Sequence, residues 1–270
     1  MEVQFLYPGH KTKALTFSYD DGQIYDRKLV DIFNHYGMKG SFHLNSGLLD
    51  REGYVTSDEI KGLYKGHEIS CHGVLHNYLN HLPKELLMHE LWEDRRRLEE
   101  LSENIIIGMS YAYGEYSDEV VNCLNQIGIK YARTVESSSR FSIPADFLKW
   151  KPTCHHNDDV LNKAKKFLDA PGYMKLSLFY IWGHSFEFER ENKWDMIEEL
   201  CKMVSDQDDI WYTTNIDYYK YIMAMKNIVF SINQSYVYNP SGTAVWFKQD
   251  DNIVTIQPGE TRKLEAGIKA

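Results

Sequence analysis

The stretch Thr16-Phe17-Ser18-Tyr19-Asp20-Asp21-Gly22 decides how the rest of the chain is interpreted. An apolar, β-prone run over residues 14–19 ends abruptly in two adjacent carboxylates and a glycine. This pattern is typical of a buried strand that delivers acidic side chains to the edge of a sheet. Two neighbouring carboxylates raise each other's pKa unless a cation or hydrogen bonds intervene. The pair therefore lies either on a solvated turn, as most Asp-Asp-Gly triplets do, or beside a positive group supplied by another part of the chain.

Strand-like and helix-like segments alternate through most of the chain. Predicted strands cover residues 13–19, 41–44, 67–71, 105–109, 130–135, 174–182 and 210–213. Predicted helices cover residues 25–36, 58–64, 84–101, 117–127, 158–168, 193–205 and 216–225. This βαβα rhythm indicates an α/β fold with a parallel sheet covered by helices, and the number of repeats favours a barrel over an open sheet.

The pattern changes near Asn227. Short alternating runs separated by turn residues replace the helices, and they predict strands at residues 229–232, 237–239, 244–247, 253–256 and 261–264. A segment of this size does not easily fold alone. We therefore expect a barrel over residues 1–226 and a small antiparallel β appendage over residues 227–270, packed on the barrel as a brace rather than as a sugar-binding module.

Composition excludes several classes of function. The 270 residues are 43% apolar and 26% charged, which is ordinary for a soluble globular protein. The net charge of −9, without a cluster of Lys and Arg, argues against a nucleic-acid partner. No stretch approaches the roughly 18 uninterrupted apolar residues of a membrane helix, so no membrane partner is expected. Aromatic residues reach 14%, and partly exposed rings are one way in which proteins hold sugars.

Residues 1–5 lack the basic and apolar segments of a secretory signal. The four cysteines are far apart and form no paired-spacing motif, so reduced thiols are expected. We therefore expect a cytoplasmic protein, whereas a signal removed from the sequence would imply an extracellular one. The sequence leaves the oligomeric state open.

Two histidines follow the predicted strand at residues 67–71. The spacing of His72 and His76 brings both rings to one face if the chain turns helical, and metal sites use this spacing. An isolated pair of this kind is more often a surface feature. Here it follows a strand, as Asp20 and Asp21 do, so all four side chains are expected at the same carboxyl edge, where barrel enzymes keep their sites. One Asp and two His around a divalent cation form a hydrolytic site, and the other Asp stays free as a base.

Residues 16–22 and His72-Gly73-Val74-Leu75-His76 resemble the first two motifs of polysaccharide deacetylases, the NodB-homology group of carbohydrate esterase family 4. Residues 41–47 and 66–70 fit this family as well, and the resemblance covers roughly residues 10–225. It implies an irregular (β/α)7-type barrel, in agreement with the pattern of strands and helices. By position, it implies that Asp20 is the general base and that Asp21, His72 and His76 are the metal ligands.

The third motif departs from the family pattern. Where the family has Arg-x-Pro-Tyr-Gly, this chain has Ser110-Tyr111-Ala112-Tyr113-Gly114. The resemblance implies that the backbone N–H of Tyr113 still stabilises an oxyanion as a catalytic group. Ser110 replaces the arginine that orients the base in the family. Some other group must therefore steady Asp20, or the enzyme is slow.

The last motif lies in residues 178–187. By resemblance, His184 occupies the place of the family's general acid, although a lone histidine after an apolar strand is often structural. Trp150 loosely matches the tryptophan that walls the family's acetyl pocket, and a core position explains it equally well. Trp150, Trp182 and Tyr111 are the expected substrate contacts.

His155 and His156 precede Asp158 and Asp159, and these four residues are a candidate for a second metal cluster. A solvated loop that caps the following helix is the simpler interpretation of the same residues.

The resemblance implies metal-dependent hydrolysis of N-acetyl groups, or less readily O-acetyl groups, on a carbohydrate such as an acetylated amino sugar. Zinc is the expected cation, and cobalt, nickel, manganese and iron also accept these ligands. Two alternatives stay open. One is hydrolysis of small cyclic or linear amides, such as ureides, on the same fold, and the other is a carbohydrate-binding protein with a weakened site. The sequence does not name the sugar, its linkage or its length.

Overall fold

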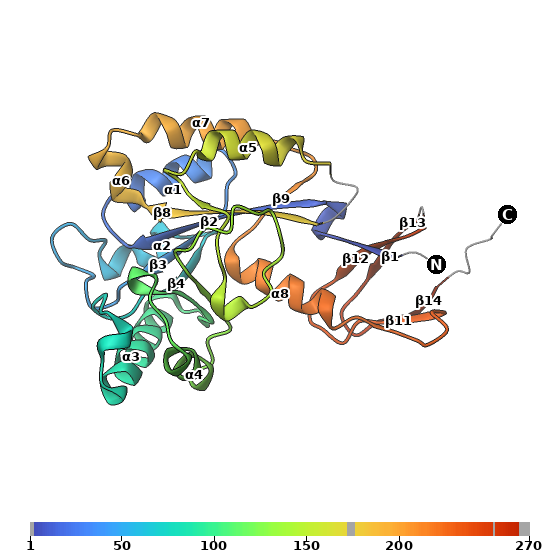
Figure 1. Cartoon of the computed structure of the whole chain (residues 1–270), viewed down its shortest axis with the longest axis horizontal. Helices are drawn as coiled ribbons and strands as arrows, with labels where there is room; N and C mark the ends of the chain where they lie inside the picture. The colour runs from blue at the N-terminus through green and yellow to red at the C-terminus, as the bar shows by residue number, and fades with distance from the viewer. Residues whose placement is uncertain (1–2, 172–175, 251, 265–270) are drawn as a thin grey trace.

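The computed structural model describes residues 3–171, 176–250 and 252–264 (Figure 1). Its central element is a parallel sheet made of β2 (Lys13–Asp21), β3 (Gly40–Leu44), β4 (Glu68–Cys71), β5 (Gly108–Ser110), β6 (Tyr131–Arg133), β7 (Cys154–His155), β8 (Ser177–His184) and β9 (Ile210–Tyr212). The strand order is β6-β5-β4-β3-β2-β8-β7, and β9 also pairs with β2. The sheet curls into a partial barrel, which confirms the predicted α/β fold.

Helices cover both sides of this sheet. They are α1 (Asp26–His35), α2 (Ile60–Leu63), α3 (Lys84–Ser102), α4 (Asp118–Gln126), α5 (Val160–Asp169), α6 (Ser185–Arg190), α7 (Trp194–Val204) and α8 (Asn215–Lys226). Figure 1 shows α1, α5, α6 and α7 on one side of the sheet and α3 and α4 on the other. Among the helices described, we find none with the length and apolar character that crossing a bilayer requires.

The strand β2 is the centre of the sheet because it pairs with three others. It pairs with β8 from Lys13 to Asp20, while its first part also pairs with β9 and its last part with β3. All of its residues except Asp21 are buried, as expected for a parallel strand covered on both faces. Its carboxyl end therefore places the two carboxylates next to His184, the register partner of Asp20 on β8.

Several elements differ from the sequence-based prediction. The predicted strand at 174–182 starts outside the described residues, and β8 continues to His184. The two-residue strand β7 and the short helix α6 were not predicted, because elements of this length show no periodicity. Through β7 the chain between β6 and β8 joins the sheet: Trp150 bridges to Arg133, and Cys154 pairs with Ile181.

The appendage consists of two small antiparallel sheets. One contains β1 (Val3–Leu6), β12 (Val245–Gln249) and β13 (Asn252–Ile256), and the other contains β10 (Val229–Phe230), β11 (Tyr236–Tyr238) and β14 (Thr261–Lys263). They agree with the antiparallel strands predicted for this region. The strand β1 was not predicted, and it gives the appendage a contribution from the N-terminal segment of the chain. The division at residue 226 stays a prediction.

Much of the aromatic content is structural. A core cluster next to α8 contains Tyr7, Trp150, Tyr180, Tyr218 and Tyr221, all almost fully buried. The hydroxyl groups of Tyr7 and Tyr218 lie 3.0 Å apart, so these buried phenols satisfy each other.

Glu68 is a buried carboxyl group that joins four elements at the start of β4. It accepts hydrogen bonds from the Ser41 hydroxyl on β3 (2.7 Å), from the Ile216 N–H on α8 (2.8 Å) and from the Tyr131 hydroxyl on β6. Burial raises the pKa of Glu68 to about 7, although these hydrogen bonds oppose the shift.

We expect the substitution Glu68→Gln to change the pH dependence of stability. In the folded protein Glu68 has a pKa of about 7, against about 4.3 in an unfolded chain. Because the folded state binds this proton more tightly, its contribution is fully present below the unfolded pKa and is lost as the pH rises through 7. The wild type should therefore lose roughly 3 kcal/mol between pH 4 and 8 that the glutamine variant keeps.

Urea unfolding of both proteins across this pH range measures the difference. The matched control is Glu100→Gln on the exposed side of α3. Free energies of unfolding that differ from wild type by a constant amount at every pH would contradict the expected role of Glu68.

Candidate functional site

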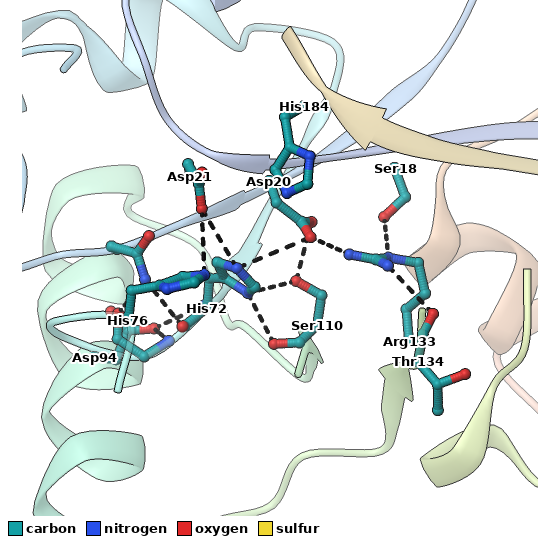
Figure 2. Close-up of polar contacts among 12 residues, drawn as sticks. Ser18, Asp20, Asp21, His72, His76, Asp94, Ser110, Arg133, Thr134 and His184 are labelled. Atoms are coloured by element: carbon teal, nitrogen blue, oxygen red, sulfur yellow. Dashed lines mark hydrogen bonds and ion pairs between the residues drawn. The ribbon is translucent and has the colours of Figure 1, made fainter. Parts of the chain in front are cut away.

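The two carboxylates at the end of β2 lie in one polar cluster with three histidines (Figure 2). His184 ends the neighbouring strand β8, while His72 and His76 follow β4 on the other side of β3. Asp20 and His72 are almost fully buried, and Asp21 and His76 are only partly exposed. The carboxyl edge of the sheet thus brings these five side chains together.

Asp21, His72 and His76 converge on one point. The Oδ1 atom of Asp21 lies 3.5 Å from Nε2 of His72 and 3.6 Å from Nε2 of His76. Neither Asp21 Oδ1 nor His72 Nε2 has a hydrogen-bond partner among the described residues, although both are buried. A tetrahedral cation with bonds of about 2.0–2.2 Å separates its ligand atoms by about 3.3–3.6 Å. The residues present therefore fit a divalent cation.

His72 is oriented to use Nε2 as a ligand. Its Nδ1 lies 2.9 Å from the Ser110 carbonyl oxygen and 2.7 Å from the Ser110 hydroxyl. An Nδ1–H group that donates to a carbonyl leaves the lone pair on Nε2, which is the usual arrangement of metal-bound histidine. Burial lowers the pKa of His72 to about 3, so the ring is neutral and able to bind a metal.

The two rings meet without the helical turn that their spacing suggested. Gly73 (φ 88°) and His76 (φ 58°) are left-handed, and residues 72–76 form a loop. Asp94 on α3 holds this loop, because its carboxylate accepts the backbone N–H groups of His72 (3.0 Å), Gly73 (2.9 Å) and Ser46 (2.9 Å). A buried carboxylate thus fixes the backbone that carries the ligands.

Arg133 on β6 is the positive partner that the adjacent carboxylates require. It is fully buried, and its Nη2 donates to Oδ2 of Asp20. Its Nε donates to the Ser18 hydroxyl (3.0 Å) and its Nη1 to the Thr134 carbonyl (3.2 Å), while the guanidinium lies over the ring of Trp182. Figure 2 shows Asp20 between this guanidinium and His72.

Ser110 and Arg133 are register partners on β5 and β6. The Ser110 hydroxyl donates to Oδ1 of Asp20 at 3.0 Å, so a hydroxyl group and a guanidinium from neighbouring strands hold the two oxygens of one carboxylate. The serine at position 110 therefore does not leave Asp20 without a cationic partner. Sequence reasoning missed Arg133, although an arginine inside a buried-type strand is a signal, because a buried charge is costly unless it is paired.

The two carboxylates differ in their ionisation. Burial opposes the ionisation of Asp20, but Arg133 and then the nearby histidines outweigh it and hold the pKa of Asp20 well below its usual value. For Asp21, burial is the largest influence and raises the pKa, with a further contribution from Asp20. A cation bound at Asp21 would remove this penalty.

His184 faces several carboxylates. Burial opposes its protonation, but Glu187 and then Asp20 and Asp21 outweigh burial and raise the pKa of His184. Its Nδ1 lies 3.3 Å from Oε2 of Glu187. An imidazole that keeps its proton beside an ionised carboxylate is suited to donate that proton.

Tyr113 lies beside the most exposed ligand of the cluster. Its backbone is left-handed (φ 58°), and its ring centroid is 4.4 Å from that of His76. The Tyr113 ring also stacks on the ring of Tyr78, with 3.7 Å between the ring centroids. The Tyr113 ring thus packs against one of the three converging side chains.

Of the three expected substrate contacts, only Trp182 lies at the site. Trp150 is 1% exposed and packs against Tyr180, and Tyr111 is 0% exposed. Rings that are enclosed in packed layers cannot reach a substrate, so these placements contradict the expectation for Trp150 and Tyr111. Trp182 is 8% exposed, with its ring centroid 5.7 Å from that of His184, and its role stays a prediction.

Comparison with known proteins finds a matching family model for part of the chain. Residues 8–132 match the family model described as polysaccharide deacetylase. This part of the chain resembles the polysaccharide deacetylase family, whose members are hydrolases of amide or ester bonds and are generally metal-dependent. No curated protein matches the sequence significantly.

Solved structures share the fold over most of the chain. A putative polysaccharide deacetylase from Mycobacterium smegmatis is 17% identical with a TM-score of 0.63, and the match covers 83% of this chain and 94% of that one. A probable polysaccharide deacetylase from Pseudomonas aeruginosa PAO1 is 14% identical (TM-score 0.65, coverage 79% and 92%). Puue allantoinase is 15% identical (TM-score 0.64, coverage 79% and 91%). At these identities the likeness concerns the fold.

We expect Asp94→Asn to weaken the binding of a divalent cation at Asp21, His72 and His76. Asparagine offers one acceptor oxygen and turns N–H groups toward the remaining backbone amides, so the loop is no longer fixed. Changes to groups that orient metal ligands typically cost about 10–100-fold in affinity. The zinc dissociation constant, measured by competition with a chromophoric chelator, tests this expectation.

The matched control for this substitution is Asp118→Asn, because Asp118 is exposed on α4. Equal zinc affinity in Asp94→Asn and wild type, with unchanged circular dichroism, would show that the loop does not depend on Asp94.

Proposed function

We propose that the protein is a metal-dependent deacetylase that hydrolyses N-acetyl groups, or O-acetyl groups, on a carbohydrate. The observation that carries this proposal is the different environment of two adjacent carboxylates. Asp20 is bound by Arg133 and Ser110, whereas Asp21 converges with two imidazoles. Metal-assisted hydrolysis of an acetyl group can use this division, in which one carboxylate holds a cation while the other accepts a proton.

Asp21, His72 and His76 are the proposed ligands of the cation. When bound, a cation of this kind polarises a carbonyl group and lowers the pKa of water from about 15.7 to about 7. Zinc suits two imidazoles and one carboxylate, and cobalt, nickel, manganese or iron accept the same ligand types.

Asp20 is the proposed general base. Its Oδ2 lies 3.8 Å from Nε2 of His72, so it borders the ligand set and is placed to take a proton from the attacking water. Arg133 and Ser110 keep it ionised and fix its direction. Tyr113, whose ring contacts His76, is proposed to donate its backbone N–H to the acetyl oxygen as this oxygen gains negative charge.

His184 is the proposed general acid. Its raised pKa favours the protonated ring, and it lies on the strand adjacent to Asp20. It would give this proton to the departing nitrogen of the amino sugar, while Trp182 is retained as the expected contact with the sugar.

Zinc-loaded protein is expected to release acetate from N-acetylglucosamine oligomers. Asp20→Asn and His76→Ala should lower kcat by at least about 10²-fold, because they remove the base and a ligand. His89→Ala, on the exposed side of α3, is the control and should be as active as wild type.

Full activity in Asp20→Asn or His76→Ala would contradict the assignment of these residues as the base and a metal ligand. Hydrolysis of allantoin without any acetate release from sugars would instead favour the small-amide alternative.

Arg133→Met is expected to move the acid limb of the kcat/KM profile to higher pH. Arg133 holds the pKa of Asp20 down, so its removal raises that pKa toward or above the ordinary value of about 3.9. Because Asp20 works only when ionised, activity at pH 5 should fall more than activity at pH 8. Arg133→Lys keeps the charge without the two-pronged geometry and should show a smaller shift.

The measurement is kcat/KM between pH 4.5 and 9 for the three proteins. A profile that is reduced by the same factor at every pH would mean that Arg133 only supports the fold.

A further inference from the structure

A second group of metal-ligating side chains lies beside His184, apart from Asp21, His72 and His76. The Nε2 atoms of His155 and His156 both lie 3.1 Å from Oε2 of Glu187. All three ligand atoms are within 4.8 Å of one another. They come from the end of β7, the residue after it, and the first turn of α6, at the edge where β7 pairs with β8.

The Oε2 atom of Glu187 has more nitrogen neighbours than hydrogen bonding explains. Besides the two rings, it faces Nδ1 of His184 at 3.3 Å and accepts the backbone N–H of His184 at 3.1 Å. A carboxylate offers about four lone-pair sites over both of its oxygens. Both ring nitrogens of His156 and Nδ1 of His184 nevertheless lack a hydrogen-bond partner among the described residues. Of these, Nε2 of His156 and Nδ1 of His184 lie close to Oε2 of Glu187 without the geometry of a hydrogen bond.

The separations match those of ligands around a common cation. Ligand atoms in a tetrahedral site with bonds of about 2.0–2.1 Å are about 3.3–3.4 Å apart. The 3.1 Å contacts of Glu187 lie near this value, as do the 3.5 and 3.6 Å contacts of Asp21. Both groups combine such separations with buried ring nitrogens that have no hydrogen bond.

Packing seats His156 in this place. Its ring, fully buried, stacks on Tyr19 and lies 4.3 Å from the ring of Phe188. On its Nδ1 side is Gly183, where an added Cβ atom would come within 2.1 Å of His156 Nδ1. The glycine thus makes room for the imidazole. A buried ring whose nitrogens have no hydrogen-bond partner in the described part of the chain is costly.

Of the three side chains, His155 is the least well prepared to bind a cation. Its Nδ1 accepts the Asn157 N–H at 3.2 Å, which leaves the ring proton on Nε2. His155 must give up this hydrogen bond before Nε2 binds a cation. His156 and Glu187 are therefore the ligands on which a site here depends.

We propose that His156, Glu187 and His155 form a second site, weaker than the first, for a divalent transition-metal cation such as zinc. Two imidazoles and one carboxylate are ligands that zinc accepts. The binding claim is independent of the proposed deacetylase function, and only its consequence rests on that function. Glu187 faces Nδ1 of His184, so a cation held by Glu187 removes the carboxylate partner of the proposed acid. Occupation of the second site should therefore inhibit hydrolysis.

Zinc stoichiometry of the whole chain tests the site without reference to activity. Metal-free wild type, titrated with zinc by isothermal calorimetry, should bind two equivalents. Glu187→Gln should bind one and lose the weaker equivalent, while His76→Ala should lose the tighter one. His89→Gln, an exposed histidine on α3, is the matched control and should keep both. A single equivalent in wild type, or two in Glu187→Gln, overturns the proposal.

A second variant keeps the proposal testable if Glu187→Gln fails to fold. His155 and Glu187 have side chains that are 20% exposed, so His155→Gln leaves no buried cavity. It should raise the dissociation constant of the weaker equivalent at least tenfold and leave the tighter one unchanged. Equal affinity for the weaker equivalent in His155→Gln and wild type counts against His155 as a ligand and overturns the three-residue site.

Activity is a separate readout of the consequence. Acetate release by wild type should fall when the zinc content rises from one equivalent to two, and the fall should be smaller in His155→Gln at the same zinc concentration. If neither protein releases acetate, the proposed function fails while the stoichiometry still decides the second site.

Discussion

The ion pair between Asp20 and Arg133 is the interaction on which the candidate site depends. Both side chains are almost fully buried, and a charge buried alone would cost several kcal/mol. The pair is satisfied further by the hydroxyl groups of Ser110 and Ser18. It therefore joins the carboxyl ends of β2, β5 and β6. Arg133 is committed to Asp20, and the side chains that converge on the neighbouring Asp21 are two imidazole rings.

The position of Arg133 also explains why a motif comparison along the chain was misleading. Residues 110 and 133 are register partners on neighbouring parallel strands, which lie about 4.8 Å apart. A long arginine side chain spans that distance, so a guanidinium from either strand reaches the same carboxylate. The chemistry requires a cation at a point in space, whereas the motif records a position in the sequence. With Ser110 and Arg133 together, the base is held at both oxygens.

Those parts of the fold that have a local signal were predictable. The apolar pattern of β2 and the spacing of the histidines after β4 are visible in the sequence. Because parallel strands share a carboxyl edge, both groups could be predicted to lie at the same edge of the sheet. Contacts between distant segments carry no such signal. The pairing of β1 with β12, the two-residue strand β7 and the approach of Glu187 to His156 belong to this class. Trp150 was ambiguous for the same reason, because it is buried against Tyr180 and Tyr218, which are distant in the sequence.

The three carboxylates at this edge are neutralised in three different ways. Asp20 is paired with a guanidinium, which stays charged at every accessible pH. Asp21 faces imidazoles that fit a cation. Glu187 faces His184, whose pKa it raises, and two further imidazoles with which, as we propose, it holds a second cation. Only the first of these partners is permanent. Asp20 therefore keeps its charge and its orientation whether or not the two neighbouring histidine clusters bind metal. Metal binding or a change of pH acts first on Asp21 and His184. The chain has a net charge of −9. Within the site, this arrangement separates the permanently paired Asp20 from Asp21 and Glu187, whose partners exchange protons or cations with the solvent.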